Sequence, residues 1–239
     1  MRRFWFDQGQ PAPPSQTVTR LTAPRAAAIA GILFSILLIA ILLLLRQSVP
    51  VDPLETGQWL LAHAETVALA LHLTPFAGIA FLWFIGVLRD RLGAQEDRFF
   101  ATVFLGSGLL FIAMLFVSAA MAGGVIVIYT AQPNGLIASA TFALARAMTY
   151  EVMNVYAIKM AGVFMIVTST LAMRTGFIAR WIALLGYALA VALLLSSRYF
   201  GEISLVFPLW VLLTSSYILI DNLRQPHPSA AAHPENPSQ

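Results

Sequence analysis

The sequence contains no cysteine, and only 10% of its 239 residues are charged. The missing cysteines exclude disulfides, thiol catalysis and cysteine-ligated metal or iron–sulfur centres. No H-E-x-x-H segment typical of metalloproteases is present. Transmembrane haem would need paired histidines on facing helices, and only His72 lies deep within an apolar run. We therefore predict no cofactor and no metal, and a non-enzymatic protein is favoured over an enzyme.

Hydrophobic residues make up 59% of the chain, and the mean hydropathy is +0.80. Several apolar runs approach or exceed the ~20 residues that a helix needs to cross a bilayer. Unpaired backbone polar groups exclude open sheets from lipid, so the composition predicts an all-α, polytopic transmembrane helix bundle. The net charge of +3 comes from arginines at the ends of apolar runs rather than on one face, so we predict no nucleic-acid partner.

One transmembrane domain is predicted over residues 26–221, between a disordered cytoplasmic arm (1–25) and a disordered cytoplasmic tail (222–239) that are both rich in proline. About six spans are expected, at residues 26–45, 65–88, 100–122, 151–173, 179–197 and 203–221.

Two of the expected helices are too long for simple spans. Asp52 has the character of an N-cap and Pro53 that of a first helical residue, which predicts a helical extension over residues 53–64. The proline-free stretch after Asn134 predicts a second extension over residues 136–150. Each extension is expected either to lie along the membrane surface or to project beyond it.

The distribution of basic residues predicts the topology. With six spans and the amino terminus inside, ten basic residues fall on the cytoplasmic side and four on the other. Because cytoplasmic loops are enriched in arginine and lysine, we expect both termini to be cytoplasmic.

Polar and ionisable residues within the apolar helices are costly in lipid and are the best pointers to a site. In the six-span topology they fall in the outer half and could form one polar cluster that binds a solute, a proton or a lipid head group. In the alternative interpretation they are boundary residues that reach the interface or form structural ion pairs. The candidates are Glu65, His72, Arg146, Glu151, Asn154 and Lys159.

The segment RDRLGAQEDR joins two apolar arms and carries the densest charge in the sequence. Its arginines, Arg89, Arg91 and Arg98, favour attraction to anionic lipid and pairing with local carboxylates. The alternative is a docking point for a cytoplasmic partner. Elsewhere, small residues such as Gly31, Gly106 and Gly186 lie in spacings suited to close helix packing.

The segments PFAGIAFLWFIGVLRDRLG, EDRFFATVFLGSGLLF and TGFIARWIALLGYALAVALLL resemble parts of uncharacterised multi-pass membrane proteins from actinobacteria and related bacteria. The resemblance implies a six-span protein of the bacterial cytoplasmic (inner) membrane and carries no catalytic residues. Three functions stay open: a transporter-like or accessory membrane subunit, a membrane enzyme acting on lipid or quinone, and a signalling or assembly factor using residues 89–98. The expected partners are membrane lipids and either a second copy of the chain or another membrane protein.

Overall fold

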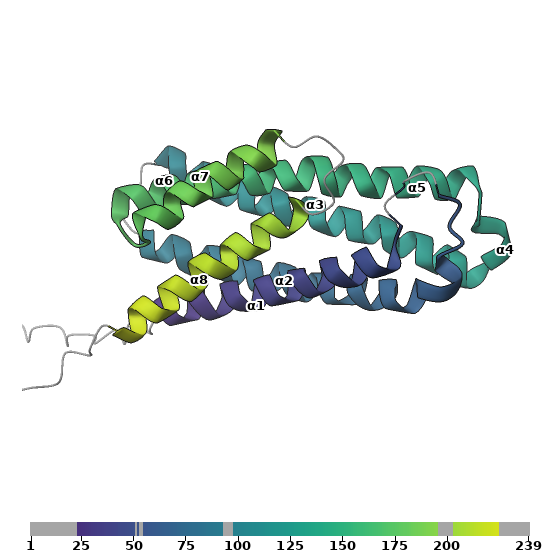
Figure 1. Cartoon of the computed structure of the whole chain (residues 1–239), viewed down its shortest axis with the longest axis horizontal. Helices are drawn as coiled ribbons and strands as arrows, with labels where there is room; N and C mark the ends of the chain where they lie inside the picture. The colour runs from purple at the N-terminus through teal and green to yellow at the C-terminus, as the bar shows by residue number, and fades with distance from the viewer. Residues whose placement is uncertain (1–22, 51, 53–54, 93–97, 196–202, 225–239) are drawn as a thin grey trace, which may run out of the picture.

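The computed structural model of this chain is a bundle of long helices (Figure 1). It describes residues 23–50, 52, 55–92, 98–195 and 203–224. One π-helix (η2) continues the long helix α5 into α6, and one short 3-10 helix (η3) precedes α8. In chain order the elements are α1 (Ala23–Ser48), α2 (Leu60–Leu92), α3 (Arg98–Ala131), α4 (Pro133–Leu136), α5 (Ala140–Glu151), η2 (Val152–Ala157), α6 (Ile158–Thr175), α7 (Arg180–Leu195), η3 (Ile203–Leu205) and α8 (Val206–Arg224).

Within the part of the chain that the structure describes, five helical stretches are long and apolar enough to cross a membrane. The seventh helix, α7, is also apolar but has only 16 residues. The chain is therefore a helical bundle compatible with a multi-pass membrane protein. The five long stretches are Ala26–Ser48, Leu60–Arg89, Phe99–Ala131, Ala140–Thr175 and Ile203–Arg224.

The helices run roughly along one direction, with α8 crossing the bundle obliquely (Figure 1). Helix α1 packs along α2 on one side and against α8 on the other, while α3 contacts both α2 and α6. Helix α7 folds back along α6. The beginning of α1 and the end of α8 lie at one end of the bundle, and α4 and the beginning of α5 lie at the other (Figure 1).

The second helix begins later than the local sequence signals predicted. Residues 55–59 are not helical, and α2 begins at Leu60, whereas Asp52 and Pro53 predicted a start at residue 53. Gly57 adopts a φ of 90°, which glycine tolerates better than other residues. A Cβ atom at Gly57 would lie 2.8 Å from Cζ of Phe142. Gly57 therefore packs closely against Phe142 of α5, and residues 55–59 stay outside the helix.

The helix predicted to begin at residue 136 begins at Ala140 instead, because residues 137–139 are not helical and separate it from the short helix α4. Ser139 caps α5, because its Oγ accepts a hydrogen bond from the backbone N–H of Phe142 over 3.1 Å. The helical stretch then runs for 36 residues to Thr175. At ~1.5 Å per residue it is longer than the ~30 Å hydrocarbon core. The predicted extension and the predicted span therefore form one rod.

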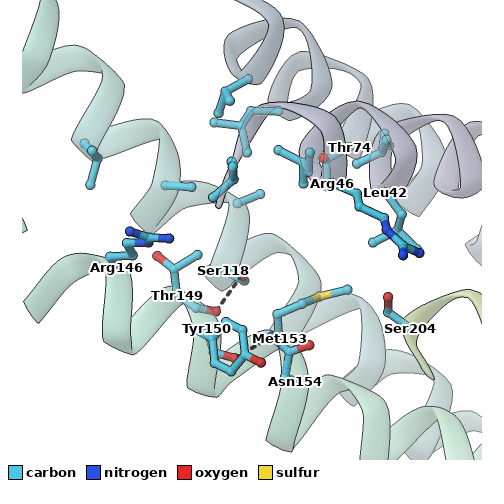
Figure 2. Close-up of a pocket in the computed structure, with 18 of the residues that line it drawn as sticks. Leu42, Arg46, Thr74, Ser118, Arg146, Thr149, Tyr150, Met153, Asn154 and Ser204 are labelled. Atoms are coloured by element: carbon cyan, nitrogen blue, oxygen red, sulfur yellow. Dashed lines mark hydrogen bonds between the residues drawn. The ribbon is translucent and has the colours of Figure 1, made fainter. Parts of the chain in front are cut away.

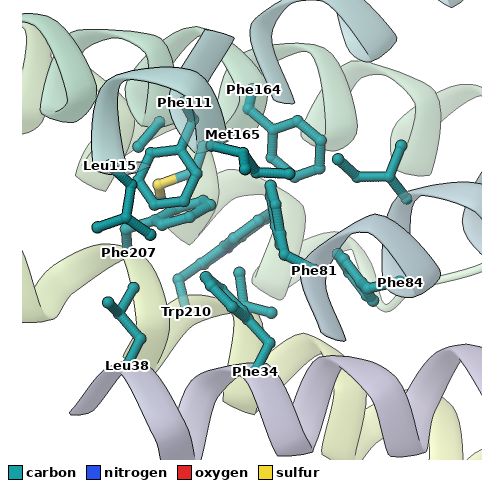
Figure 3. Close-up of a cluster of buried hydrophobic side chains, with 14 of the residues drawn as sticks. Phe34, Leu38, Phe81, Phe84, Phe111, Leu115, Phe164, Met165, Phe207 and Trp210 are labelled. Atoms are coloured by element: carbon teal, nitrogen blue, oxygen red, sulfur yellow. The ribbon is translucent and has the colours of Figure 1, made fainter. Parts of the chain in front are cut away.

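A cluster of aromatic side chains joins the helices near the middle of the bundle (Figure 3). The ring of Phe81 on α2 lies 4.5 Å from that of Phe34 on α1, 5.2 Å from Phe164 on α6 and 5.7 Å from Phe207 on α8. Phe111 on α3 completes the cluster, 4.8 Å from Phe207. Since all five rings are buried, this cluster is the main apolar contact among five helices.

The outward faces of the long helices are also apolar. Large side chains are exposed on several helices, among them Leu33 on α1, Trp83 on α2 and Leu184 on α7. A soluble monomer rarely exposes large contiguous apolar patches, whereas lipid contact explains apolar residues on the outside of a bundle. The exposure pattern agrees with a membrane-embedded bundle.

Two of the small residues singled out in the sequence lie at close helix contacts. A Cβ atom at Gly31 would lie 2.8 Å from Cδ2 of Phe84 and would also meet Ser215. A Cβ atom at Gly186 would lie 2.8 Å from Nε1 of Trp210. Gly106, in contrast, has open space where its Cβ would be. Close packing therefore involves Gly31 and Gly186 but not Gly106.

Candidate ligand-binding cavity

A cavity of about 280 Å³ lies toward the end of the bundle where α1 ends and α2 begins. Its walls come from α1, α2, α3, α5 and η2, with Ser204 of η3 at one edge (Figure 2). Most of the lining is aliphatic, including Leu38 and Leu115, which also belong to the buried core around the phenylalanine cluster. The core thus closes the cavity toward the middle of the bundle.

Two departures from regular α-helix border the cavity. On α2, Pro75 lacks a backbone N–H, so the carbonyl of Leu71 has no helical donor from that residue. On the long rod, the six-residue π-helix η2 places Met153 and Asn154 in the lining. Such irregular backbone within a membrane bundle occurs where it is buried in protein or lines a cavity, and π-helical turns are frequent at functional sites.

The neutral polar side chains of the lining mostly bond to backbone carbonyls. Ser118 on α3 donates to the carbonyl of Thr149 over 3.0 Å, across to the end of α5. Thr149 donates to the carbonyl of Ala145 over 2.8 Å, and Asn154 Nδ2 donates to the carbonyl of Tyr150 over 3.1 Å (Figure 2). Two of these bonds reach the carbonyls of Thr149 and Tyr150, just before the π-helix, and all three occupy donors of lining side chains.

Arg146 lines the cavity from α5 and is half-buried. Its guanidinium donates from NH2 to the carbonyl of Pro50 over 2.7 Å and from NH1 to the carbonyl of Glu55 over 3.1 Å. Its Cζ atom lies 5.9 Å from the ring centroid of Trp59, within range of a cation–π contact. Arg146 thus joins α5 to the connection between α1 and α2.

A second arginine lines the cavity from the last turn of α1. Arg46 lies on the opposite side of the cavity from Arg146, toward Ser204 (Figure 2). Its side chain is exposed. The cavity therefore has an apolar interior with a guanidinium on two of its sides.

The structure brings only part of the predicted polar cluster to this cavity. Arg146 and Asn154 line it, but Glu65 and His72 are exposed on α2 and do not. Glu151 is half-buried and is also absent from the lining.

The side chain of Lys159 has a structural partner instead. Its Nζ donates to the carbonyl of Leu194 over 2.9 Å, near the end of α7. A positive charge at a helix C-terminus stabilises the unpaired carbonyls there. Lys159 therefore ties α6 to α7 rather than contributing to the cavity.

The charged segment between α2 and α3 falls largely outside the described residues. Arg89 is exposed near the end of α2, and the side chains of Arg91 and Arg98 are not described. At the same end of the bundle, Cζ of Arg174 lies 4.4 Å from the ring centroid of Phe100. The docking interpretation of residues 89–98 stays a prediction.

Sequence reasoning missed three features of the cavity: Arg46, Ser118 and the π-helix. Arg46 was assigned to topology because it follows an apolar run. Ser118 is one of many small polar residues in apolar runs, and no sequence signal separates it from the others. Pro75 is a usable signal in the sequence, because proline bends or breaks helices and this one lies beside the cavity residues Thr74 and Leu71.

Among the residues that the structure describes, no group of three or more histidine and acidic side chains is placed to hold a metal ion. No protein-family model, curated protein or solved structure matches the chain. The described part of the chain forms a helical protein with several helices able to cross a membrane, and the cavity lies among these helices.

Proposed function

We propose that this protein is a non-enzymatic, transporter-like or accessory subunit of the bacterial inner membrane that holds an amphipathic, lipid-like molecule in the cavity. The observation that carries the proposal is the pairing of a mostly aliphatic interior with Arg46 and Arg146 at its sides. Small-molecule sites are typically apolar cavities with a few placed polar groups.

The proposed topology has six crossings with both termini in the cytoplasm, α7 being the shortest crossing. The arginine distribution supports this arrangement. The beginning of α1 and the end of α8 lie at the same end of the bundle, which agrees with an even number of crossings (Figure 1). The cavity would then open toward the outer side of the membrane.

The lining supports binding rather than proton-transfer catalysis. Its described residues include no histidine, aspartate, glutamate or lysine, and arginine stays protonated in proteins. A general acid or base works best with a pKa near the operating pH. A membrane enzyme acting on lipid or quinone, the alternative, would have to use the phenol of Tyr150 or groups outside the described lining.

Photo-crosslinking tests the proposal. The protein is placed in nanodiscs of phosphatidylcholine and labelled with a single-chain amphiphile that carries a diazirine on its chain. Peptides of α1, α3 and η2 that line the cavity should be labelled in proportion to occupancy, and an excess of unlabelled amphiphile should compete.

A pair of variants on α3 provides the control. Ala119 lines the cavity, whereas the neighbouring Ala120 is exposed and does not. Ala119→Trp should abolish competable labelling, and Ala120→Trp should preserve it. Labelling confined to outward-facing residues, or equal labelling in both variants, would refute the proposal.

A further inference from the structure

We infer that the molecule held in this cavity is a single-chain amphiphile with an anionic carboxylate or phosphate head group that binds Arg146, its chain extending toward Leu38 and Leu115. The inference rests on the proposed function and names the chemical class of the ligand.

The charge of the lining is one-sided. Arg46 and Arg146 are the charged side chains among the described lining residues, and both are cations. Within the described residues Arg146 donates to the neutral carbonyls of Pro50 and Glu55 rather than to a carboxylate. The carboxylates of Glu55 and Asp52 attract the guanidinium electrostatically, but no hydrogen bond from Arg146 to either carboxylate is present among the described residues. A partly buried cation without a direct counter-ion favours an anionic ligand.

The hydrogen-bonding capacity of Arg146 also fits an anion. A guanidinium has five N–H donors, and the two contacts to carbonyls leave further donors on the same planar group. Carboxylate and phosphate accept charge-assisted bonds that are about twice as strong as neutral ones. Arginine also suits these groups geometrically, because its donors form a planar fork.

The neutral polar side chains of the wall offer little to an uncharged head group. The hydroxyls of Ser118 and Thr149 and the amide nitrogen of Asn154 donate to backbone carbonyls. The indole N–H of Trp59 has no hydrogen-bond partner among the described residues, but apart from it a head group rich in hydroxyls finds few free donors here. A head group with a terminal cation, such as choline, would be repelled by Arg146.

The size of the cavity favours one chain over two. Its volume of about 280 Å³ is just below the range of roughly 300–1,000 Å³ typical of small-molecule sites. Leu38 and Leu115 lie at its closed side against the phenylalanine cluster (Figure 3). A chain whose head group binds Arg146 would thus end against the core.

Binding of matched amphiphiles to the protein in phosphatidylcholine nanodiscs tests this inference. The probes share a hexadecyl-length chain and differ in head group: hexadecanoate, hexadecyl phosphate, monohexadecanoyl glycerol and hexadecylphosphocholine. We expect the two anionic probes to bind at least about tenfold more tightly than the other two. Because exposed charges are screened by salt, raising the salt concentration should weaken only the anionic probes.

Substituting Arg146 tests whether this side chain binds the head group. Arg146→Gln should weaken binding of the anionic probes about tenfold to a hundredfold, as expected for a lost hydrogen-bonded charge, and leave the neutral probe unchanged. Arg146→Lys, which keeps the charge, should retain part of the preference. The matched control is Arg174→Gln, which removes an exposed arginine that is not in the cavity lining.

The outcomes separate the inference from the proposed function. Equal binding of charged and neutral probes, or equal weakening of all probes by Arg146→Gln, would overturn the anionic head group while a lipid-binding cavity stands. Displacement of the amphiphile by inorganic phosphate at low millimolar concentration would indicate a free anion as the ligand. Preferential retention of a two-chain lipid would overturn the single chain. Failure of every probe to bind would refute the proposed function itself.

Discussion

The guanidinium of Arg146 donates a hydrogen bond to the backbone carbonyl of Pro50 over 2.7 Å, joining the long helical rod to the segment that follows α1. A second bond to the carbonyl of Glu55 strengthens this link. Hydrogen bonds from charged groups contribute about 1.5–3 kcal/mol each. We expect Arg146→Ala to lower the thermal midpoint in detergent more than Arg174→Ala does. Equal midpoints would contradict a structural role for these bonds.

Gly186 is expected to tolerate no side chain. Alanine in its place would meet Ser169 and the indole nitrogen of Trp210, so Gly186→Ala should destabilise the bundle by about 1–3 kcal/mol. Gly106→Ala is the control, because nothing lies where its Cβ would be, and alanine favours the helix by up to ~1 kcal/mol. Thermal unfolding of both variants measures the difference. A Gly186→Ala protein as stable as the wild type would show that the contact between α7 and α8 is loose.

Phe81 is expected to be costly to truncate, because its ring contacts four other helices through Phe34, Phe111, Phe164 and Phe207. Phe81→Ala should cost about 3–5 kcal/mol, the usual range for a buried aromatic ring. Phe76 lies on the same helix but is 61% exposed, so Phe76→Ala should cost little in detergent. Detergent-solubilised yield and thermal midpoint are the readouts. Similar losses for both variants would argue against the cluster as the centre of the core.

Lys159 is expected to matter for stability and not for ligand binding. Lys159→Met removes the bond to the carbonyl of Leu194 and should lower stability by about 1.5–3 kcal/mol. The affinity for any amphiphile should be unchanged, because Lys159 does not line the cavity. Titrating the variant with hexadecanoate checks this. A large loss of affinity would show that Lys159 takes part in ligand binding.

Ser118 is expected to stabilise the junction between α5 and the π-helix. Ser118→Ala removes its bond to the carbonyl of Thr149, which links two helices, and should cost about 0.5–1.5 kcal/mol. Ser107→Ala is the comparison, since Ser107 bonds only to carbonyls of its own helix. Hydrogen exchange should become faster around residues 149–157 in the first variant only. Unchanged exchange there would mean that the π-helix does not depend on α3.

The apolar runs predicted the long helices well, because a helix must satisfy its own backbone in lipid and its length follows from the bilayer. The start of α2 differs from the prediction, because the capping signal at Asp52 is local, whereas the packing of Gly57 against Phe142 involves a distant helix. Local signals of that kind do not reveal which distant side chain will occupy the neighbouring space.

The candidate site was predictable only in part, for the same reason. Arg146 and Asn154 were identified because polar residues in apolar helices are rare. The helical face that each residue presents depends on neighbouring helices, so the spacing of Glu65 and His72 did not reveal that both are exposed. The π-helix, with Ser118 of α3 bonded beside it, arises from contacts between helices that the sequence does not display.

The central claim is that the cavity holds one amphiphilic molecule per chain, and native mass spectrometry of the purified protein tests it most directly. After release from nanodiscs, the wild-type protein and Ala120→Trp should each carry one added mass of a single-chain anionic amphiphile supplied beforehand. Ala119→Trp, which fills the cavity, should carry none. Equal retention by Ala119→Trp and the wild type would contradict the account.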